Sequence, residues 1–155
     1  MSPAFLTHIE AVAKKFGQLL HSRPIHFPLG ASAVPEKGVY LFSESDDYLY
    51  VGRSDSIRDR LNTHQRNSAL VNQAAFASIL AKQGCGLKNM PYTQVAPGKH
   101  FSEKPNFRKA FSNAKQRIRK MDIRVVEEAD PVTQALLEIY VAVTLPTRYN
   151  DFSNH

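Results

Sequence analysis

Hydrophobic residues near the start of the chain recur every three or four positions, which is the spacing of a helix with one apolar face. This spacing predicts a helix over residues 3–22. Its apolar positions are Phe5, Ile9, Val12, Phe16 and Leu19. The next segment, residues 23–38, contains three prolines and two glycines and therefore predicts an extended connector.

Two short apolar runs follow, separated by a polar turn, and together they predict a β-hairpin. The two strands are expected at Gly38–Phe42 and Tyr48–Gly52, with Ser-Glu-Ser-Asp-Asp between them. The polar triplet at 54–56 can cap a helix that begins near residue 57 and ends near residue 65. A second helix is predicted from about residue 68 to residue 82.

The second half of the chain predicts a strand between two helices of different character. A basic helix is expected over residues 106–120, and a strand over residues 121–130. The buried members of that strand are predicted to be Ile123, Val125 and Val126. Pro131 opens a last helix, which is apolar nearly all round and is therefore predicted to be buried.

These elements predict a small α+β protein, with one sheet made from the hairpin and the later strand. A length of 155 residues predicts one domain, residues 1–155. The chain is 43% hydrophobic, which is enough for one ordinary core.

Composition excludes several classes of protein. No stretch approaches the roughly 18 consecutive apolar residues of a membrane span, and the N-terminus lacks the apolar region of a signal peptide. The single cysteine, Cys85, excludes an internal disulfide framework and a multi-cysteine zinc site. We therefore expect a cytoplasmic protein with no membrane partner.

Positive charge is concentrated in one segment. The net charge is +6, and residues 100–124 carry the whole surplus, because the rest of the chain has equal numbers of cations and acids. The cations of this basic segment are Lys104, Arg108, Lys109, Lys115, Arg117, Arg119, Lys120 and Arg124. The pattern fits either a surface for a polyanion or an ordinary solvated helix face.

Three further features could carry chemistry. Arg60 and His64 are four residues apart in the predicted helix after the hairpin, so they share one face. Glu138 is the only charged residue in 131–147, and a carboxylate in an apolar helix needs a cation, a donor or a metal. Asn150 follows that helix. Each feature alone also has a structural explanation, such as a surface pair or a glutamate at the helix edge.

In combination these features resemble the GIY-YIG nucleases. Gly-Val-Tyr at 38–40 and Tyr-Val-Gly at 50–52 look like the paired signature of that family, with valine in place of isoleucine in both. The stretch after them, RSDSIRDRLNTH, matches the family pattern of a polar cap, an apolar residue, an arginine and a histidine four residues later. By this pattern Arg60 and His64 are the signature arginine and histidine.

The resemblance implies a three-stranded sheet flanked by helices, and hydrolysis of phosphodiester bonds with one divalent ion, Mg²⁺ or Mn²⁺. It covers about residues 38–152. It implies a nuclease core at 34–155, preceded by an N-terminal helix and connector at 1–33. The stretch at about 66–121 exceeds the minimal core of the family and is interpreted as an insertion.

The resemblance also implies roles for the site residues. Glu138 would be the catalytic glutamate that holds the metal ion, and Arg60 would bind phosphate oxygens. Tyr40 would be the general base, with its pKa lowered by the nearby cations Arg53 and His64.

Three of these residues have supporting or alternative roles. Tyr50 would position the phosphate or a water, and Asn150 would orient Glu138 or a water. His64 could instead hydrogen-bond Tyr40 or contact phosphate directly. The expected nucleic-acid contacts are Arg53 and the eight cations of the basic segment.

The predicted function is a divalent-metal-dependent endonuclease acting on DNA. Two alternatives are a catalytically inactive nucleic-acid-binding module on the same fold, and an RNase or toxin-type nuclease. The sequence leaves the preferred nucleic-acid structure and the oligomeric state open.

Overall fold

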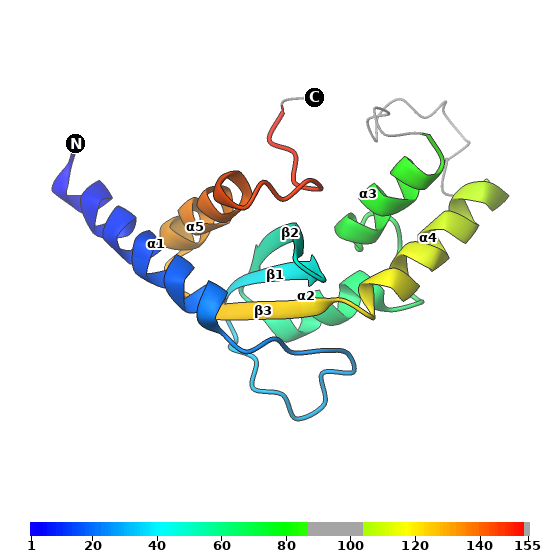
Figure 1. The fold of residues 1–155 in the computed structure, drawn as a ribbon, viewed down its shortest axis with the longest axis horizontal. Coiled ribbons are helices and arrows are strands. Elements are labelled where there is room, and N and C mark those ends of the chain that lie inside the picture. The colour runs from blue at the N-terminus through cyan, green and yellow to red at the C-terminus, as the bar shows by residue number, and fades with distance from the viewer. Residues whose placement is uncertain (87–103, 154–155) are drawn as a thin grey trace. The chain divides into compact units, whose positions relative to one another are not determined.

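A computed structural model describes residues 1–86 and 104–153 of the chain, and its fold is α+β. Within these residues the chain forms five helices and one antiparallel sheet of three strands in the order β2-β1-β3, shown in Figure 1. The α+β class and the three-stranded sheet predicted from the sequence are confirmed.

The chain divides into two compact units. The first unit consists of Met1–Arg60 and Met121–Asn150, and it contains the whole sheet. The second unit consists of Leu61–Lys120 and the residues after Asn150. The sequence-based division into a core and an insertion at about 66–121 stays a prediction, as does the single domain.

The first helix, α1 (Pro3–His21), has a local reason to begin where it does. The hydroxyl of Ser2 accepts a hydrogen bond from the backbone N–H of Phe5 at 3.2 Å, and Pro3 occupies the first helical position. The connector after α1 touches the sheet at Ile25, which pairs with Ile123. The helix predicted over residues 3–22 is confirmed.

The hairpin strands are β1 (Gly38–Glu44) and β2 (Asp47–Ser54), and the third strand is β3 (Asp122–Glu127). β1 lies in the middle, antiparallel to both neighbours. Gly38 has a φ of 155°, and a side chain there would overlap the backbone of Val126, so glycine is required where β1 starts.

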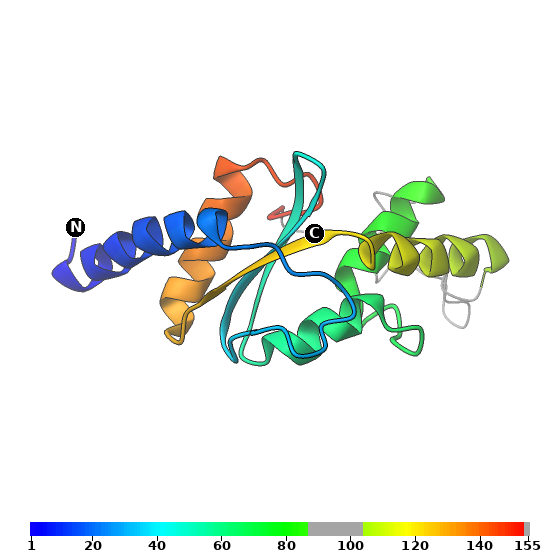
Figure 2. The same ribbon diagram turned by 60° about the horizontal axis from the view of Figure 1, so that its bottom comes forward.

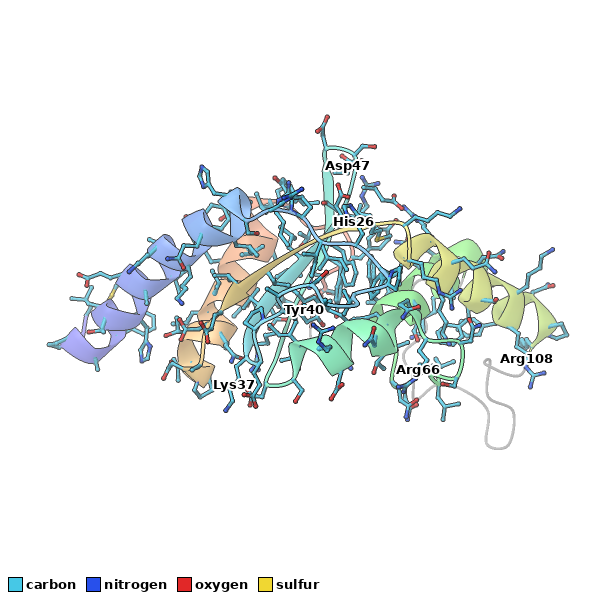
Figure 3. All side chains as sticks on the ribbon, turned by 90° about the horizontal axis from the view of Figure 1, so that it is seen from below. His26, Lys37, Tyr40, Asp47, Arg66 and Arg108 are labelled. Atoms are coloured by element: carbon cyan, nitrogen blue, oxygen red, sulfur yellow. The ribbon has the colours of Figure 1, made fainter. Side chains whose placement is uncertain are left out.

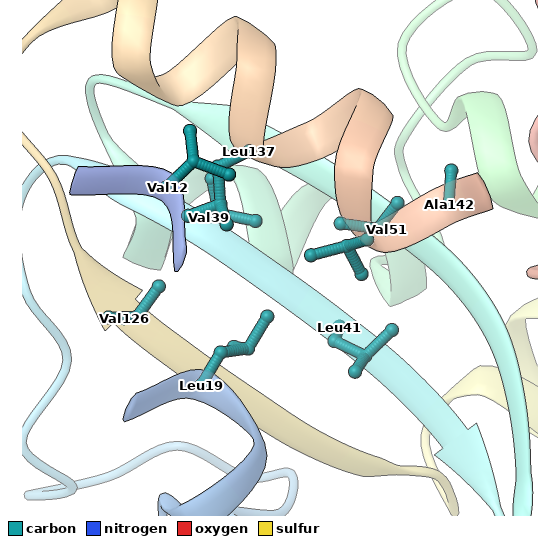
Figure 4. Packing of buried hydrophobic residues seen from close by; sticks show 9 residues of the cluster. Val12, Leu19, Val39, Leu41, Val51, Val126, Leu137 and Ala142 are labelled. Carbon is teal, nitrogen blue, oxygen red and sulfur yellow. The ribbon is translucent and has the colours of Figure 1, made fainter. Parts of the chain in front are cut away.

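One face of the sheet is covered by α1 and by α5 (Pro131–Thr144), as Figures 1 and 2 show. Val39, Leu41 and Val51 alternate along the hairpin and point to this face, because side chains in a strand alternate between its two sides. Figure 4 shows these strand residues packed with Leu19 of α1 and Leu137 of α5. This cluster is the main core of the first unit.

The helix α5 corrects one prediction. The sequence predicted that this helix, apolar nearly all round, is buried, but Ile139 and Val143 are 47% and 69% exposed. Only the side of α5 that carries Leu137 and Val141 reaches the core, since a helix resting on one sheet face buries one stripe.

The second unit contains α3 (Ala75–Gly84) and α4 (Pro105–Ile118), and α2 (Ile57–Gln65) runs from the first unit into it. The ranges predicted for α2 and α4 are close to those observed. The helix predicted at 68–82 begins only at Ala75, because residues before it form turns. In one of them the side-chain oxygen of Gln73 accepts a hydrogen bond from the N–H of Leu70 at 2.8 Å.

Candidate active site

The candidate site lies at the β2 edge of the sheet. β2 is an outer strand, and its Gly52 is the direct cross-strand partner of Tyr40 on β1. A Cβ atom on Gly52 would overlap the ring and hydroxyl of Tyr40. The phenol therefore lies across Gly52 and reaches from the central strand to the outer one, where only glycine leaves room for it.

The phenol of Tyr40 is 1% exposed and packs edge-on against Phe42, with 5.8 Å between ring centroids. Burial raises its pKa above the usual value of a tyrosine, and nearby Tyr50 raises it further. Arg60 opposes both effects through its charge and a hydrogen bond to the phenol, while the Glu138 carboxylate adds to the rise.

This environment contradicts the expectation that cations lower the pKa of Tyr40. That effect was expected from Arg53 and His64, but the cation beside the hydroxyl is Arg60, and burial outweighs its effect on the pKa. Tyr40 is consequently a neutral phenol at physiological pH.

The start of α2 positions Arg60. The backbone N–H of Arg60 donates to the carbonyl of Ser56 at 3.0 Å in the first turn of the helix. Two residues earlier, Arg58 donates to the carbonyls of Gly30 and Ser32 at 3.0 and 2.6 Å, which ties α2 to the connector. The two arginines point in different directions, as their spacing predicts, and only Arg60 interacts with Tyr40.

Glu138 enters the site from α5 and is paired with Arg53 of β2. The Arg53 Nε atom donates to Glu138 Oε2 at 3.1 Å, and the two side chains are 45% and 25% exposed. Burial raises the pKa of the Glu138 carboxyl, and Arg53 partly offsets the rise by charge and hydrogen bonding. The sequence-based argument that this carboxylate needs a partner is confirmed, and the partner is a cation.

Gln134 is a residue of the site that was not expected from the sequence. It lies one turn before Glu138 on α5, is 1% exposed, and donates to the carbonyl of Glu128 at 2.7 Å and to the carboxylate of Asp55 at 3.2 Å. These bonds fix the rotation of α5 and hence the direction of Glu138. The available signal was a polar amide, four positions before Glu138, in a mostly apolar helix.

Tyr50 lies on the same sheet face as Tyr40, because it pairs with Phe42 two positions along β1. It is half-buried and close enough to influence the pKa of Tyr40. The structure therefore brings both signature tyrosines to one place. The predicted role of Tyr50 in positioning phosphate or water stays a prediction.

Asn150 also lies at the β2 edge, but its amide is engaged with the strand. Its Oδ1 accepts from the N–H of Val51 at 2.9 Å and from the hydroxyl of Thr147 at 2.8 Å, and its Nδ2 donates to the carbonyl of Val51 at 2.8 Å. These bonds close the open edge beside Gly52 and anchor the residues after α5. The role predicted beside Glu138 stays a prediction.

His64 belongs to the second unit. It is fully buried, and its ring meets Phe76 of α3 edge-on at 6.4 Å between centroids. It shares α2 with Arg60, as predicted. Its proposed contacts with Tyr40 or phosphate stay predictions.

Lys115 corrects the predicted nucleic-acid contacts. It is 2% exposed, and its ammonium donates to the carbonyls of Asn67 and Ala69 at 3.1 and 2.6 Å while lying 4.1 Å from the ring centroid of Phe111. A buried ammonium cannot reach a phosphate in solvent. Burial, and then Arg119, lower the pKa of Lys115.

The other cations of the basic segment differ in what they touch. Arg119 donates from Nε to the side chain of Gln65 and from a terminal nitrogen to its backbone carbonyl, both at 2.8 Å. Arg124 lies on β3 in the first unit and is half-buried. Those exposed to solvent are Lys104, Arg108, Lys109, Arg117 and Lys120, and Figure 3 shows Arg108 pointing outward from α4.

At the β2 edge, the carboxylate that could bind a divalent ion is that of Glu138. Within residues 1–86 and 104–153, no three His, Cys, Asp or Glu side chains are grouped as metal ligands. Magnesium is often held by one or two carboxylates together with water and substrate phosphates. The half-buried, oxygen-bearing Glu138 fits that mode of binding, and Arg53 would compete with the ion for it.

Comparison with known proteins adds no family. No family model, no curated protein and no solved structure matches the chain. None of the helices that the structure describes has the length and apolar character needed to cross a membrane.

Proposed function

We propose that the protein is a divalent-metal-dependent endonuclease that hydrolyses phosphodiester bonds in DNA, on a GIY-YIG-like core. One observation carries the proposal. Four elements, β1, β2, α2 and α5, each direct a polar side chain to the β2 edge: Tyr40, Arg53, Arg60 and Glu138. This set combines donors for phosphate with a carboxylate for a hard cation.

The two arginines would bind the substrate. Each guanidinium presents a planar fork of N–H donors that matches the oxygens of a phosphate. Arg53 is the more exposed member of its ion pair, so it can turn from Glu138 to a phosphate and release the carboxylate. A Mg²⁺ or Mn²⁺ ion, when bound, supplies charge stabilisation for the departing oxygen.

Tyr40 would act through its hydroxyl as a hydrogen-bonding group before it acts as a base. Because its pKa is raised, the phenol keeps its proton in the free protein. Because the phenol is 1% exposed, it would hold the guanidinium of Arg60 in place for a phosphate rather than touch the phosphate itself. Removal of its proton would require more positive charge in the site than Arg60 provides.

A catalytically inactive nucleic-acid-binding module is the second candidate. The observation in its favour is that Arg53 occupies Glu138 while Tyr40 is held neutral, which is an arrangement without a ready base. Such a module would bind nucleic acid with strong salt dependence and would give no products with any divalent ion.

A cleavage panel tests the proposal. Supercoiled, linear, single-stranded, flapped and branched DNA, and RNA, would each be incubated with the protein in Mg²⁺, in Mn²⁺ and in a chelator. Metal-dependent DNA products are the expected result. Binding without products on any substrate would favour the inactive module, and products from RNA alone would replace DNA as the substrate.

A further inference from the structure

The side of α5 that points away from the core is apolar and exposed. Val132, Ile139 and Val143 are spaced by seven and four residues, so they form one stripe along the helix. Leu136 lies beside this stripe but is half-buried and packs against the core. Val132 and Ile139 are each 47% exposed, and Val143 is 69% exposed. An uninterrupted apolar stripe in water is unusual for the outer side of a surface helix.

The neighbouring helix α1 extends this surface. The two helices lie side by side, with the rings of Phe16 and Tyr140 edge-on at 5.1 Å and His8 Nδ1 at 2.8 Å from the hydroxyl of Thr133. Ile9 is seven residues before Phe16 and therefore shares the side of α1 that faces α5. Ile9 is itself exposed.

We call this surface the α1–α5 face and define it by six exposed residues. They are Leu6, Ile9, Val132, Ile139, Tyr140 and Val143. The face belongs entirely to the first unit. On α5 the only charged residue is Glu138, whose carboxylate is turned to Arg53 of β2.

The chemistry of the face limits what can cover it. Nucleic acids, anionic lipids and charged peptides need complementary charges, and the α5 side of the face has none. The six side chains expose on the order of 500 Å² of apolar surface, against about 800 Å² per partner in a standard stable interface. The polar flanks of two long helices can supply the remainder, so the face is large enough for a dimer.

We propose that two copies of this chain associate through the α1–α5 face around a twofold axis. In such an isologous contact each copy covers the apolar stripe of the other, which needs no partner of another kind. Ile139 and Glu138 are adjacent in sequence and point about 100° apart around the helix, so the dimer leaves the β2 edge open. The inference does not depend on the proposed function.

Sedimentation equilibrium of the full chain tests the dimer. We expect the measured mass to rise with protein concentration towards twice the 17.4 kDa of the monomer. Val143→Glu and Ile139→Glu should each weaken association roughly 100-fold or more, because the twofold axis buries the added charge twice. Circular dichroism and thermal melting would show whether each variant is folded.

Leu70→Glu is the matched control, since Leu70 is 62% exposed and lies in the second unit. It should associate like the wild type. If Val143→Glu fails to fold, Val143→Ser should still weaken association, because it removes apolar contact without adding charge.

Three results would overturn the proposal. The first is a wild-type protein that stays monomeric up to about 100 μM. The second is a dimer that persists in Val143→Glu and Ile139→Glu. The third is a loss of association in the control Leu70→Glu. Co-sedimentation of a monomeric wild type with vesicles of neutral phosphatidylcholine would instead assign the face to a lipid surface.

Discussion

The β2 edge and helix α4 were both expected to meet nucleic acid, yet the structure gives their cations different surroundings. At the β2 edge, Arg60 contacts a phenol and Arg53 contacts a carboxylate, so the charges are gathered around groups that can take part in chemistry. On α4, Lys115 is buried against backbone carbonyls. A count of charges therefore identifies a basic segment but does not say which cations are available to a ligand.

Among the cations, Arg60→Ala should have the largest effect on activity. Loss of the guanidinium beside Tyr40 removes a donor for the phosphate, and we expect the barrier to rise by roughly 3 kcal/mol, by analogy with a lost oxyanion donor. Single-turnover cleavage would measure the change. Arg58→Ala on the same helix is the control, because Arg58 is engaged with the connector and should affect stability more than turnover.

Lys115→Ala should produce the largest effect on stability. The substitution leaves two carbonyls without their donor and removes a contact with an aromatic ring, at a cost of about 3 kcal/mol. Urea denaturation would measure the free energy of unfolding. The exposed Lys109 of the same helix is the control, and Lys109→Ala should lie within about 0.5 kcal/mol of the wild type. Equal losses for both would contradict the structural role of Lys115.

Gly52→Ala should destabilise the protein by about 2 kcal/mol and displace Tyr40 from the site, because the added methyl group overlaps the phenol. Thermal unfolding and cleavage would both be measured. Gly17→Ala in α1 provides the comparison, since a Cβ there has no neighbour within 4 Å. That change should be neutral or stabilise by up to about 1 kcal/mol. An unaffected Gly52→Ala protein would contradict the placement of Tyr40.

Arg53→Gln should change the pH dependence of the site with a smaller effect. Arg53 lowers the pKa of Glu138 against the effect of burial, so its removal raises that pKa further. With its pKa above the unfolded value, Glu138 contributes stability at low pH that is lost as pH rises through the folded pKa. Carboxyl NMR titration should therefore show ionisation of Glu138 at higher pH, and the acid limb of cleavage should move the same way.

Arg148→Gln is the control for that shift. Arg148 and Asp47 also form an ion pair at 3.1 Å, but both side chains are largely exposed. Its loss should leave the titration of Glu138 unchanged. A pKa of Glu138 that falls in Arg53→Gln would contradict the assigned pairing.

Much of the fold follows from local pattern. The helices α1, α2 and α4 and all three strands lie close to their predicted ranges, because apolar spacing and polar caps are local properties. The late start of α3 and the exposed side of α5 were not predictable in this way. Both depend on which other segment packs there, and a single sequence does not give that information.

The site was predictable as a set of residues but not as an arrangement. The resemblance to the GIY-YIG pattern singled out Tyr40, helical spacing singled out Arg60, and its place in an apolar helix singled out Glu138. The structure brings these three side chains within interaction distance. The sequence could not show that burial raises the pKa of Tyr40, nor that Asn150 is bound to the backbone of Val51. Desolvation and long-range hydrogen bonds depend on tertiary contacts that only the fold defines.

Glu138→Gln, compared with Glu10→Gln, tests the central claim most directly. Glu10 is an exposed carboxylate on α1, a helix that contributes no residue to the candidate site, so its substitution should leave cleavage unchanged. Glu138→Gln keeps the shape of the side chain but removes the charge that would hold a divalent ion. In single-turnover assays with Mg²⁺ and Mn²⁺, the account predicts DNA cleavage by the wild type and Glu10→Gln, and none by folded Glu138→Gln. Cleavage by Glu138→Gln at the wild-type rate would contradict it.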